Sequence, residues 1–224
     1  MRIRRKKWVD KELEECSFYF DTPIDKKGKW KSFFENKNAP LQIELGCGKG
    51  TFIAEMASSN PDINYIAVDM IDTMLGLAKR NIENKFLEKN LEIKNVVLAR
   101  IDIERILMML DANDTVDRIY INFCNPWPKG KHRKKRLTHS KQLELYKTFL
   151  KPGGEIYFKT DDDGLYLDSL NYFKESEFEI INSTNDLHNN QIFDKNIITE
   201  HEKMFSEQGI KIKAIIAKYV DIKL

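Results

Sequence analysis

The stretch LQIELGCGKGTF, residues 41–52, decides the fold of this chain. Its first five residues have the length of a buried strand, and three glycines follow at every second position: Gly46, Gly48 and Gly50. Residues 51–59 are then typical of a helix. Glycine lets the backbone turn sharply and approach a ligand closely. A strand, a glycine turn and a helix in this order predict a nucleotide pocket at the carboxyl end of a parallel strand.

The glycine spacing also indicates the kind of nucleotide. A dinucleotide loop, Gly-x-Gly-x-x-Gly, would place its third glycine at position 51, where this chain has Thr51. The pattern present, Glu44-x-Gly46-x-Gly48-x-Gly50, is that of S-adenosylmethionine (SAM) loops. SAM has no phosphate and carries a sulfonium and an ammonium group, so the acid at Glu44 suits it. The sequence predicts SAM; a plain glycine-rich turn and another nucleotide are the alternatives.

Two further acids follow predicted strands. Residues 64–68 form a predicted strand that ends at Asp69, which is placed to accept hydrogen bonds from a ribose diol. NAD sites use the same device, so Asp69 favours a nucleoside without choosing one. Asp102 follows a predicted strand over residues 91–98 and allows two roles: the N-cap of a short helix, or a contact with the adenine of the cofactor.

Length and composition limit the class of protein. We expect 224 residues to form a single domain over residues 1–224. Three scattered cysteines favour neither a disulfide framework nor a zinc site, no metal constellation is evident, and no apolar run has membrane-spanning length. These features predict a cytoplasmic protein. Five basic residues lie between positions 2 and 7, so residues 1–8 form a basic arm, either a mobile tail or a contact for nucleic-acid phosphates.

The most specific stretch follows the predicted strand over residues 117–123: NPWPKGKHRKKRLT, residues 125–138. Two prolines around Trp127 stiffen the backbone and prevent a strand or helix from continuing. A basic run follows: Lys129, Lys131, Arg133, Lys134, Lys135 and Arg136. A charge run is often only a solvated surface, but this one follows an aromatic residue that can stack on a base while the cations bind phosphates. RNA is the predicted partner.

Together with the glycine loop, the Asn-Phe-x-x-Pro-Trp-Pro-Lys block and a later Lys-Thr-Asp resemble the bacterial tRNA (guanine-N7)-methyltransferases over almost the whole chain. The resemblance implies methylation of N7 of a variable-loop guanosine, position 46 of the tRNA. It also implies that Glu44, Asp69, Asp102 and Asn125 line the SAM site. The substrate contacts implied are Lys129, Asp161 and the segment Thr199, Glu200, His201 and Glu202.

The chain departs from the family pattern at two places. The family usually has Asp before Pro-Trp-Pro, where this chain has Asn125, and its late motif is usually Thr-x-Tyr-Glu or Thr-x-Phe-Glu, where this chain has His201. N7 of guanine carries a lone pair and no proton, so its methylation needs alignment rather than a general base. Alignment can supply roughly 7–11 kcal/mol. A carboxylate would also stabilise charge on the base, so we expect Asn125 to reduce activity at most.

Two later segments allow both a substrate role and a structural one. Asp161 follows a predicted strand over residues 155–159, and one carboxylate can accept both N1–H and the 2-amino group of guanine. We expect Asp161 to read the base; the alternative is that it caps the helix predicted over residues 165–173, a role for which Asp162 and Asp163 are just as available. Thr199-x-x-Glu202 fits a capping box, which is compatible with a substrate contact.

The alternation of strands and helices predicts an α/β protein with a mainly parallel, seven-stranded sheet and helices on both faces, a Rossmann-like class I methyltransferase. The last two strands are expected over residues 178–182 and 212–220, and the resemblance implies that the last is antiparallel. We expect tRNA guanine-N7 methylation. The alternatives are a non-catalytic RNA-binding protein impaired by Asn125, and a small-molecule methyltransferase, which the basic run disfavours. The sequence leaves monomer and homodimer open.

Overall fold

The computed structural model describes residues 7–190 and 196–220. The chain divides into two compact units, residues 1–114 and 115–224. The prediction of a single domain stays a prediction. Most of the predicted basic arm, residues 1–6, lies outside the described residues.

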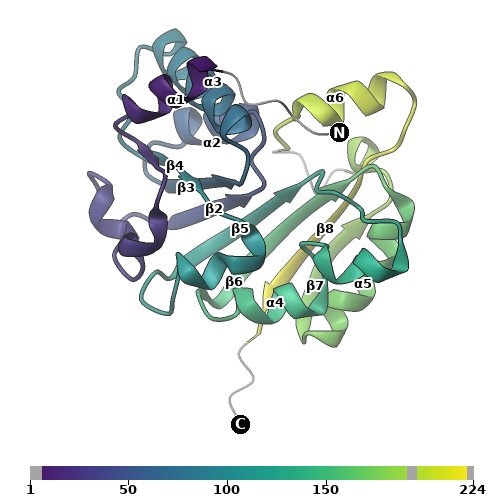
Figure 1. Cartoon of the computed structure of the whole chain (residues 1–224). Helices are drawn as coiled ribbons and strands as arrows, with labels where there is room; N and C mark the ends of the chain where they lie inside the picture. The colour runs from purple at the N-terminus through teal and green to yellow at the C-terminus, as the bar shows by residue number, and fades with distance from the viewer. Residues whose placement is uncertain (1–6, 191–195, 221–224) are drawn as a thin grey trace. The chain divides into compact units, whose positions relative to one another are not determined.

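The described part of the first unit, residues 7–114, contains four strands, all parallel, in the order β1-β4-β3-β2. Figure 1 shows α1, α2 and α3 gathered on one side of the strands β2, β3 and β4. The elements of this unit are α1 (Lys7–Glu14), β1 (Tyr19–Phe20), η1 (Pro23–Lys26), η2 (Trp30–Phe33), β2 (Leu41–Leu45), α2 (Thr51–Ser59), β3 (Asn64–Asp69), α3 (Asp72–Glu88), β4 (Val96–Arg100) and η3 (Ile103–Met108).

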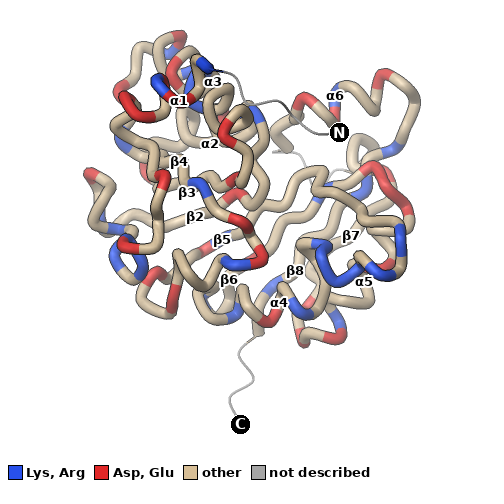
Figure 2. Tube along the Cα trace, viewed as in Figure 1, with Lys and Arg blue, Asp and Glu red and all other residues tan. Residues whose placement is uncertain are grey.

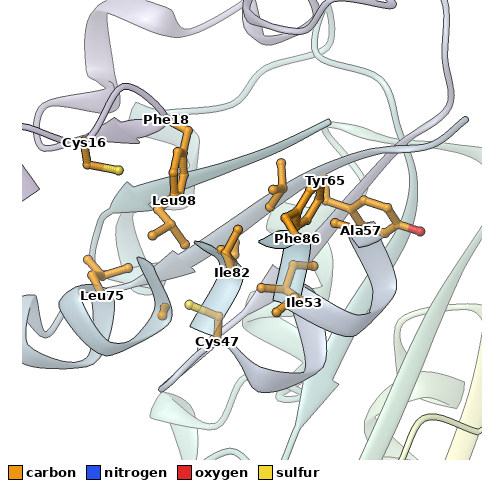
Figure 3. Close-up of a cluster of buried hydrophobic side chains, with 14 of the residues drawn as sticks. Cys16, Phe18, Cys47, Ile53, Ala57, Tyr65, Leu75, Ile82, Phe86 and Leu98 are labelled. Carbon is orange, nitrogen blue, oxygen red and sulfur yellow. The ribbon is translucent and has the colours of Figure 1, made fainter. Parts of the chain in front are cut away.

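Helices α2 and α3 bury their apolar faces against the strands, as Figure 3 shows. Burial of this apolar surface is the main favourable term in the folding of the unit. The cluster includes Cys47, Ile53, Ala57, Tyr65, Leu75, Ile82, Phe86 and Leu98. Because Cys47 belongs to this core, the glycine loop is anchored to the packed interior at its centre.

A buried carboxylate anchors the segment between β1 and β2. Asp114 is 1% exposed and accepts hydrogen bonds from the backbone N–H groups of Gly28, Trp30 and Asp111. Its pKa is nevertheless raised, because desolvation outweighs these three donors. The indole Nε1 of Trp30, itself fully buried, donates to the carbonyl of Met109 over 2.9 Å. These bonds hold a segment with little regular structure.

In the second unit, residues 115–190 and 196–220 contain four strands in the order β5-β6-β8-β7. β5 is parallel to β6, and β8 is antiparallel to both β6 and β7. Figure 1 shows α4 and α5 on one side of these strands. The elements are β5 (Val116–Asn122), η4 (Gly130–Lys135), α4 (Ser140–Tyr146), β6 (Leu150–Thr160), α5 (Asp163–Glu175), β7 (Phe178–Thr184), η5 (Leu187–Asn189), α6 (Glu200–Glu207) and β8 (Lys213–Tyr219).

The predicted fold class is confirmed: an α/β protein with mainly parallel strands and an antiparallel last strand. The predicted number of seven strands is wrong: the described residues form eight strands, because the sequence predicted neither the two-residue strand β1 nor α1. The strand predicted over residues 91–98 begins only at Val96, since the chain first leaves α3 through a turn in which the N–H of Leu91 donates to the carbonyl of Phe86. Among the described helices, none combines the length and apolar character needed to cross a membrane.

Asp114→Asn tests the anchor of this segment. An amide offers one acceptor oxygen where the carboxylate offers two, so buried N–H groups lose their partner. We expect the free energy of unfolding to fall by about 2–4 kcal/mol, measured by urea denaturation. Asp25→Asn is the matched control, because Asp25 is exposed and makes only a 3.9 Å ion pair with Lys26. An effect no larger than that of the control would contradict the anchoring role.

Candidate functional site

The glycine loop of the first unit runs from the end of β2 to the start of α2. All three glycines have left-handed backbones, with φ of 80° at Gly46, 53° at Gly48 and 70° at Gly50. The N–H groups of Gly46 and Cys47 both donate to the carbonyl of Val68 over 2.9 Å. The loop is therefore fixed to the end of β3 by its backbone.

Gly48 and Gly50 are glycines for different reasons. A Cβ atom on Gly50 would lie 2.6 Å from the Cβ of Ala78 and 2.9 Å from its Cα, so this glycine allows α2 and α3 to pack closely. A Cβ atom on Gly48 would meet no described atom within 4 Å. The backbone at Gly48 thus faces open space, as a loop that cradles a ligand requires.

Two carboxylates lie beside this loop. Asp69 accepts from the N–H of Gly48 over 3.0 Å and from the N–H of Ile71 over 2.9 Å. Glu44 is 2% exposed on β2. Burial raises the pKa of the Cys47 thiol well above its usual range, and the charges of Asp69 and Glu44 raise it further. The loop is therefore an electronegative site that suits a cationic ligand.

Desolvation also raises the pKa of Asp69, against the opposing effect of its backbone donors. A carboxylate has about four lone-pair positions, so Asp69 retains acceptor capacity for a ribose diol. Asp102 accepts from the N–H of Glu104 over 3.0 Å and caps η3. The capping role predicted for Asp102 is confirmed, and the adenine contact stays a prediction.

In the second unit, β5 ends in a strained loop. Phe123 and Trp127 have positive φ values, 52° and 42°, which cost bulky residues energy and often mark functional sites. The side-chain oxygen of Asn125 accepts from the N–H of Trp127 over 3.0 Å. Asn125 is exposed and this bond leaves its Nδ2 group as a donor. The residue therefore shapes the loop with its oxygen and presents an amide NH₂ group.

The basic run continues from this loop into η4, and Figure 2 shows Lys and Arg gathered along it. Trp127 contacts His132, with ring centroids 5.6 Å apart, and Lys135, whose ammonium lies 5.5 Å from the ring centroid. The remaining predicted phosphate contacts of the run are exposed: Lys129, Lys131, Arg133 and Lys134. Arg133 also lies 3.7 Å from Asp168.

Arg136 is an exception within the run. It is 3% exposed, its Nε donates to the carbonyl of Pro126 over 2.7 Å, and its guanidinium pairs with Asp168. A contact between Arg136 and an RNA phosphate does not fit this placement. Its buried guanidinium instead ties the Pro-Trp-Pro loop to α5, which carries Asp168.

The three consecutive acids after β6 have different partners. Asp162 caps α5 by accepting from the N–H of Leu165 over 2.6 Å. Asp163 pairs with Lys213 at 2.8 Å. Among the described residues, no group hydrogen-bonds the carboxylate of Asp161. Burial raises the pKa of the nearby Cys124 thiol, and the charge of Asp161 adds to this effect. Asp161 is therefore the acid of the three that is left for a ligand.

Glu202 lies in the late motif but is completely buried. Its carboxylate accepts from Lys159 Nζ and His188 Nε2, each at 2.8 Å, and from Asn196 Nδ2. With Thr199, which is 6% exposed, it forms the predicted capping box of α6. The ion pair with Lys159 and the hydrogen bonds lower the pKa of Glu202 despite the opposing desolvation. Direct substrate contact by Thr199 or Glu202 does not fit this burial.

The other two residues of the late motif, Glu200 and His201, are exposed. The His201 ring stacks on Phe123, with centroids 5.9 Å apart and planes inclined by 20°, and both rings contact Phe205. His201 is thus an exposed ring beside the end of β5.

Sequence reasoning missed Lys159, Lys213, His188 and Asp168, which organise the predicted residues. Lysines inside apolar strand sequences, such as IKAII at residues 212–216, were the available signal. Within the described part of the chain, no group of three or more His, Cys, Asp or Glu residues is arranged to hold a metal ion.

Comparison with known proteins gives the family. Residues 38–215 match the family described as "Putative methyltransferase". The tRNA (guanine-N(7)-)-methyltransferase of Clostridium beijerinckii is 60% identical over 97% of this chain and 98% of its own length, and that of Clostridium perfringens is 56% identical over 97% and 99%. The chain belongs to this methyltransferase family.

The fold of this methyltransferase also has solved counterparts. A 16S rRNA (adenine(1408)-N(1))-methyltransferase variant with cosubstrate SAM, from Catenulisporales acidiphilia, matches with a TM-score of 0.59 at 14% identity. The match covers 90% of this chain and 93% of that one. At this identity, the likeness shows the fold alone, and it agrees with the predicted Rossmann-like class.

The two glycines give a matched pair of variants. Gly50→Ala forces a side chain into the backbone of Ala78 at a left-handed φ, so we expect the free energy of unfolding to fall by about 2–4 kcal/mol. Gly48→Ala has only the left-handed φ to accommodate and should lose about 1 kcal/mol. Chemical denaturation of both variants checks the difference; equal losses would show that Gly50 is not a packing glycine.

Proposed function

We propose that this methyltransferase transfers a methyl group from SAM to N7 of a guanosine in the variable loop of tRNA, at position 46. The proposal is supported by one combined observation. The glycine loop is open and lies beside two carboxylates, and the chain that contains it is 60% identical, over 97% of its length, to a tRNA (guanine-N(7)-)-methyltransferase. Such a substrate also implies a cytoplasmic location.

The first unit has the residues to hold the cofactor. Gly48 leaves room at the backbone, Asp69 has acceptor capacity for the ribose hydroxyls, and Glu44 adds negative charge near the loop for the ammonium and sulfonium groups. Asp102 remains a candidate contact for adenine. SAM, when bound, supplies a methyl group activated by its positively charged sulfur.

The second unit has the residues to hold a guanine. The carboxylate of Asp161 can accept both N1–H and the 2-amino group, a pair of donors that adenine lacks. The Nδ2 group of Asn125 can donate to O6, which lies beside N7 on the same edge of guanine. Because N7 has no proton to lose, these residues need only bind and orient the base.

The basic run supplies affinity for RNA. Lys129, Lys131, Arg133 and Lys134 are exposed cations that can contact phosphates, and Trp127 offers a ring to an unstacked base. Contacts of this kind are salt-dependent, because they release counterions from the nucleic acid. Glu200 and His201 add exposed groups on α6.

The test is methyl transfer from labelled SAM to an unmodified tRNA transcript, mapped by cleavage specific for 7-methylguanosine. We expect one cleavage site, in the variable loop, and a gain of about tenfold or less for Asn125→Asp, because a carboxylate would stabilise positive charge on the methylated base but would lose the amide hydrogen bond to O6. Gly48→Ala is the negative control: its added methyl group would occupy the open space that we propose for the cofactor, so this variant should show no transfer. Methylation at another base or another guanine atom would contradict the proposal.

The second candidate is a non-catalytic RNA-binding protein, favoured by Asn125 in place of the family's Asp. It predicts that the wild-type chain binds both SAM and tRNA without transferring a methyl group. In that case Asn125→Asp would raise transfer from undetectable to robust. The same assay therefore separates the two candidates.

A further inference from the structure

Lys213 is a buried lysine at the start of β8. Its side chain is 7% exposed, and in the antiparallel pairing of β6 and β8 it lies opposite Thr160, the residue before Asp161. Removing an ammonium group from water is costly unless the group is well paired. A buried charge at this point of the chain therefore needs an explanation.

Within the described residues, the Lys213 ammonium makes two bonds, and both go to the turn after β6. Nζ donates to the backbone carbonyl of Asp161 over 2.8 Å and pairs with Oδ1 of Asp163 over 2.8 Å. The Asp163 side chain is 83% exposed, and ion pairs to exposed partners contribute little to stability. The buried position of Lys213 is therefore better explained by its hydrogen bond to the Asp161 carbonyl than by its ion pair with Asp163.

Two further hydrogen bonds in the turn after β6 restrict the backbone next to Asp161. Thr160 Oγ1 accepts from the N–H of Asp162, and the Asp162 carboxylate caps α5. The peptide groups on the C-terminal side of Asp161 are thus fixed by Lys213, Thr160 and the cap, while its carboxylate has no hydrogen-bond partner among the described residues. The turn holds the backbone of Asp161 still and leaves its side chain for a ligand.

We propose that Lys213 is a positioning residue for base recognition, which orients Asp161 toward N1–H and the 2-amino group of guanine. The inference rests on the proposed function. Lys213 acts through the Asp161 backbone and does not touch the base. Removing its ammonium should therefore weaken discrimination between bases that differ at the 2-amino group, beyond any general loss of activity.

The experiment compares two tRNA transcripts, one with guanosine and one with inosine at the target position. Inosine keeps N7, O6 and N1–H but lacks the 2-amino group. The wild-type enzyme should prefer guanosine in kcat/KM by about 10- to 100-fold, the effect of one hydrogen bond to a charged group. Asp161→Ala should abolish most of this preference.

Lys213→Met keeps the length and apolar stem of lysine and removes the ammonium. We expect its ratio of kcat/KM for guanosine to kcat/KM for inosine to fall by about tenfold, toward that of Asp161→Ala, because a displaced carboxylate loses its alignment.

Lys213→Gln, whose side chain is shorter by one bond, is the second variant. It should show the same fall if the methionine variant does not fold. SAM binding and the melting temperature report folding. Lys174→Met, the same substitution at an exposed position of α5, should keep the wild-type ratio.

The outcomes separate this proposal from the function on which it rests. No transfer to the guanosine transcript by the wild-type enzyme would contradict the proposed function itself. Transfer without a preference for guanosine would contradict base reading by Asp161 and, with it, the role of Lys213. A Lys213 variant that loses activity equally on both transcripts, or keeps the wild-type ratio, would show that the lysine only stabilises the fold.

Discussion

The ion pair between Lys159 and Glu202 determines which residues of the late motif can meet a substrate. Glu202 has no exposed surface, and the Lys159 ammonium reaches it from β6 over 2.8 Å while also binding Asn196 and the carbonyl of Ile197. An unpaired charge at this position would be strongly destabilising, so Glu202 is held to Lys159 and is not available to a ligand. Glu202 therefore stabilises the site from below its surface, and Glu200 and His201 are the residues of the motif that are exposed.

The same division recurs elsewhere in the site. At two places, a neighbour of similar chemistry holds the backbone: Asp162 caps α5 while Asp161 stays available, and Arg136 braces the Pro-Trp-Pro loop while Lys131 and Lys134 are exposed. In the first unit, Gly50 permits helix packing while Gly48 faces open space. A precise site requires this kind of support, because a small misplacement of a binding group loses much of its effect.

The parts of the site set by local sequence could be predicted. The glycine spacing, the acid at the end of β3 and the capping box each depend on residues a few positions apart. The sequence could not show which of three consecutive acids caps α5, because that choice depends on the turn and on Lys213, about fifty residues later. Nor could it show that Glu202 and Arg136 are buried, since their partners Lys159 and Asp168 come from distant elements. Charge in a motif indicates ligand contact only after burial is known.

A double-mutant cycle on the buried pair, with Lys159→Met, Glu202→Gln and the double variant, tests directly whether Glu202 supports the site. Each single variant should lower the free energy of unfolding by about 3 kcal/mol or more, measured by urea denaturation. The double variant should lose less than the sum, by about 0.5–3 kcal/mol. Additive losses would contradict a coupled buried pair. Unchanged stability of Glu202→Gln together with a raised KM for tRNA would show that Glu202 contacts the substrate instead.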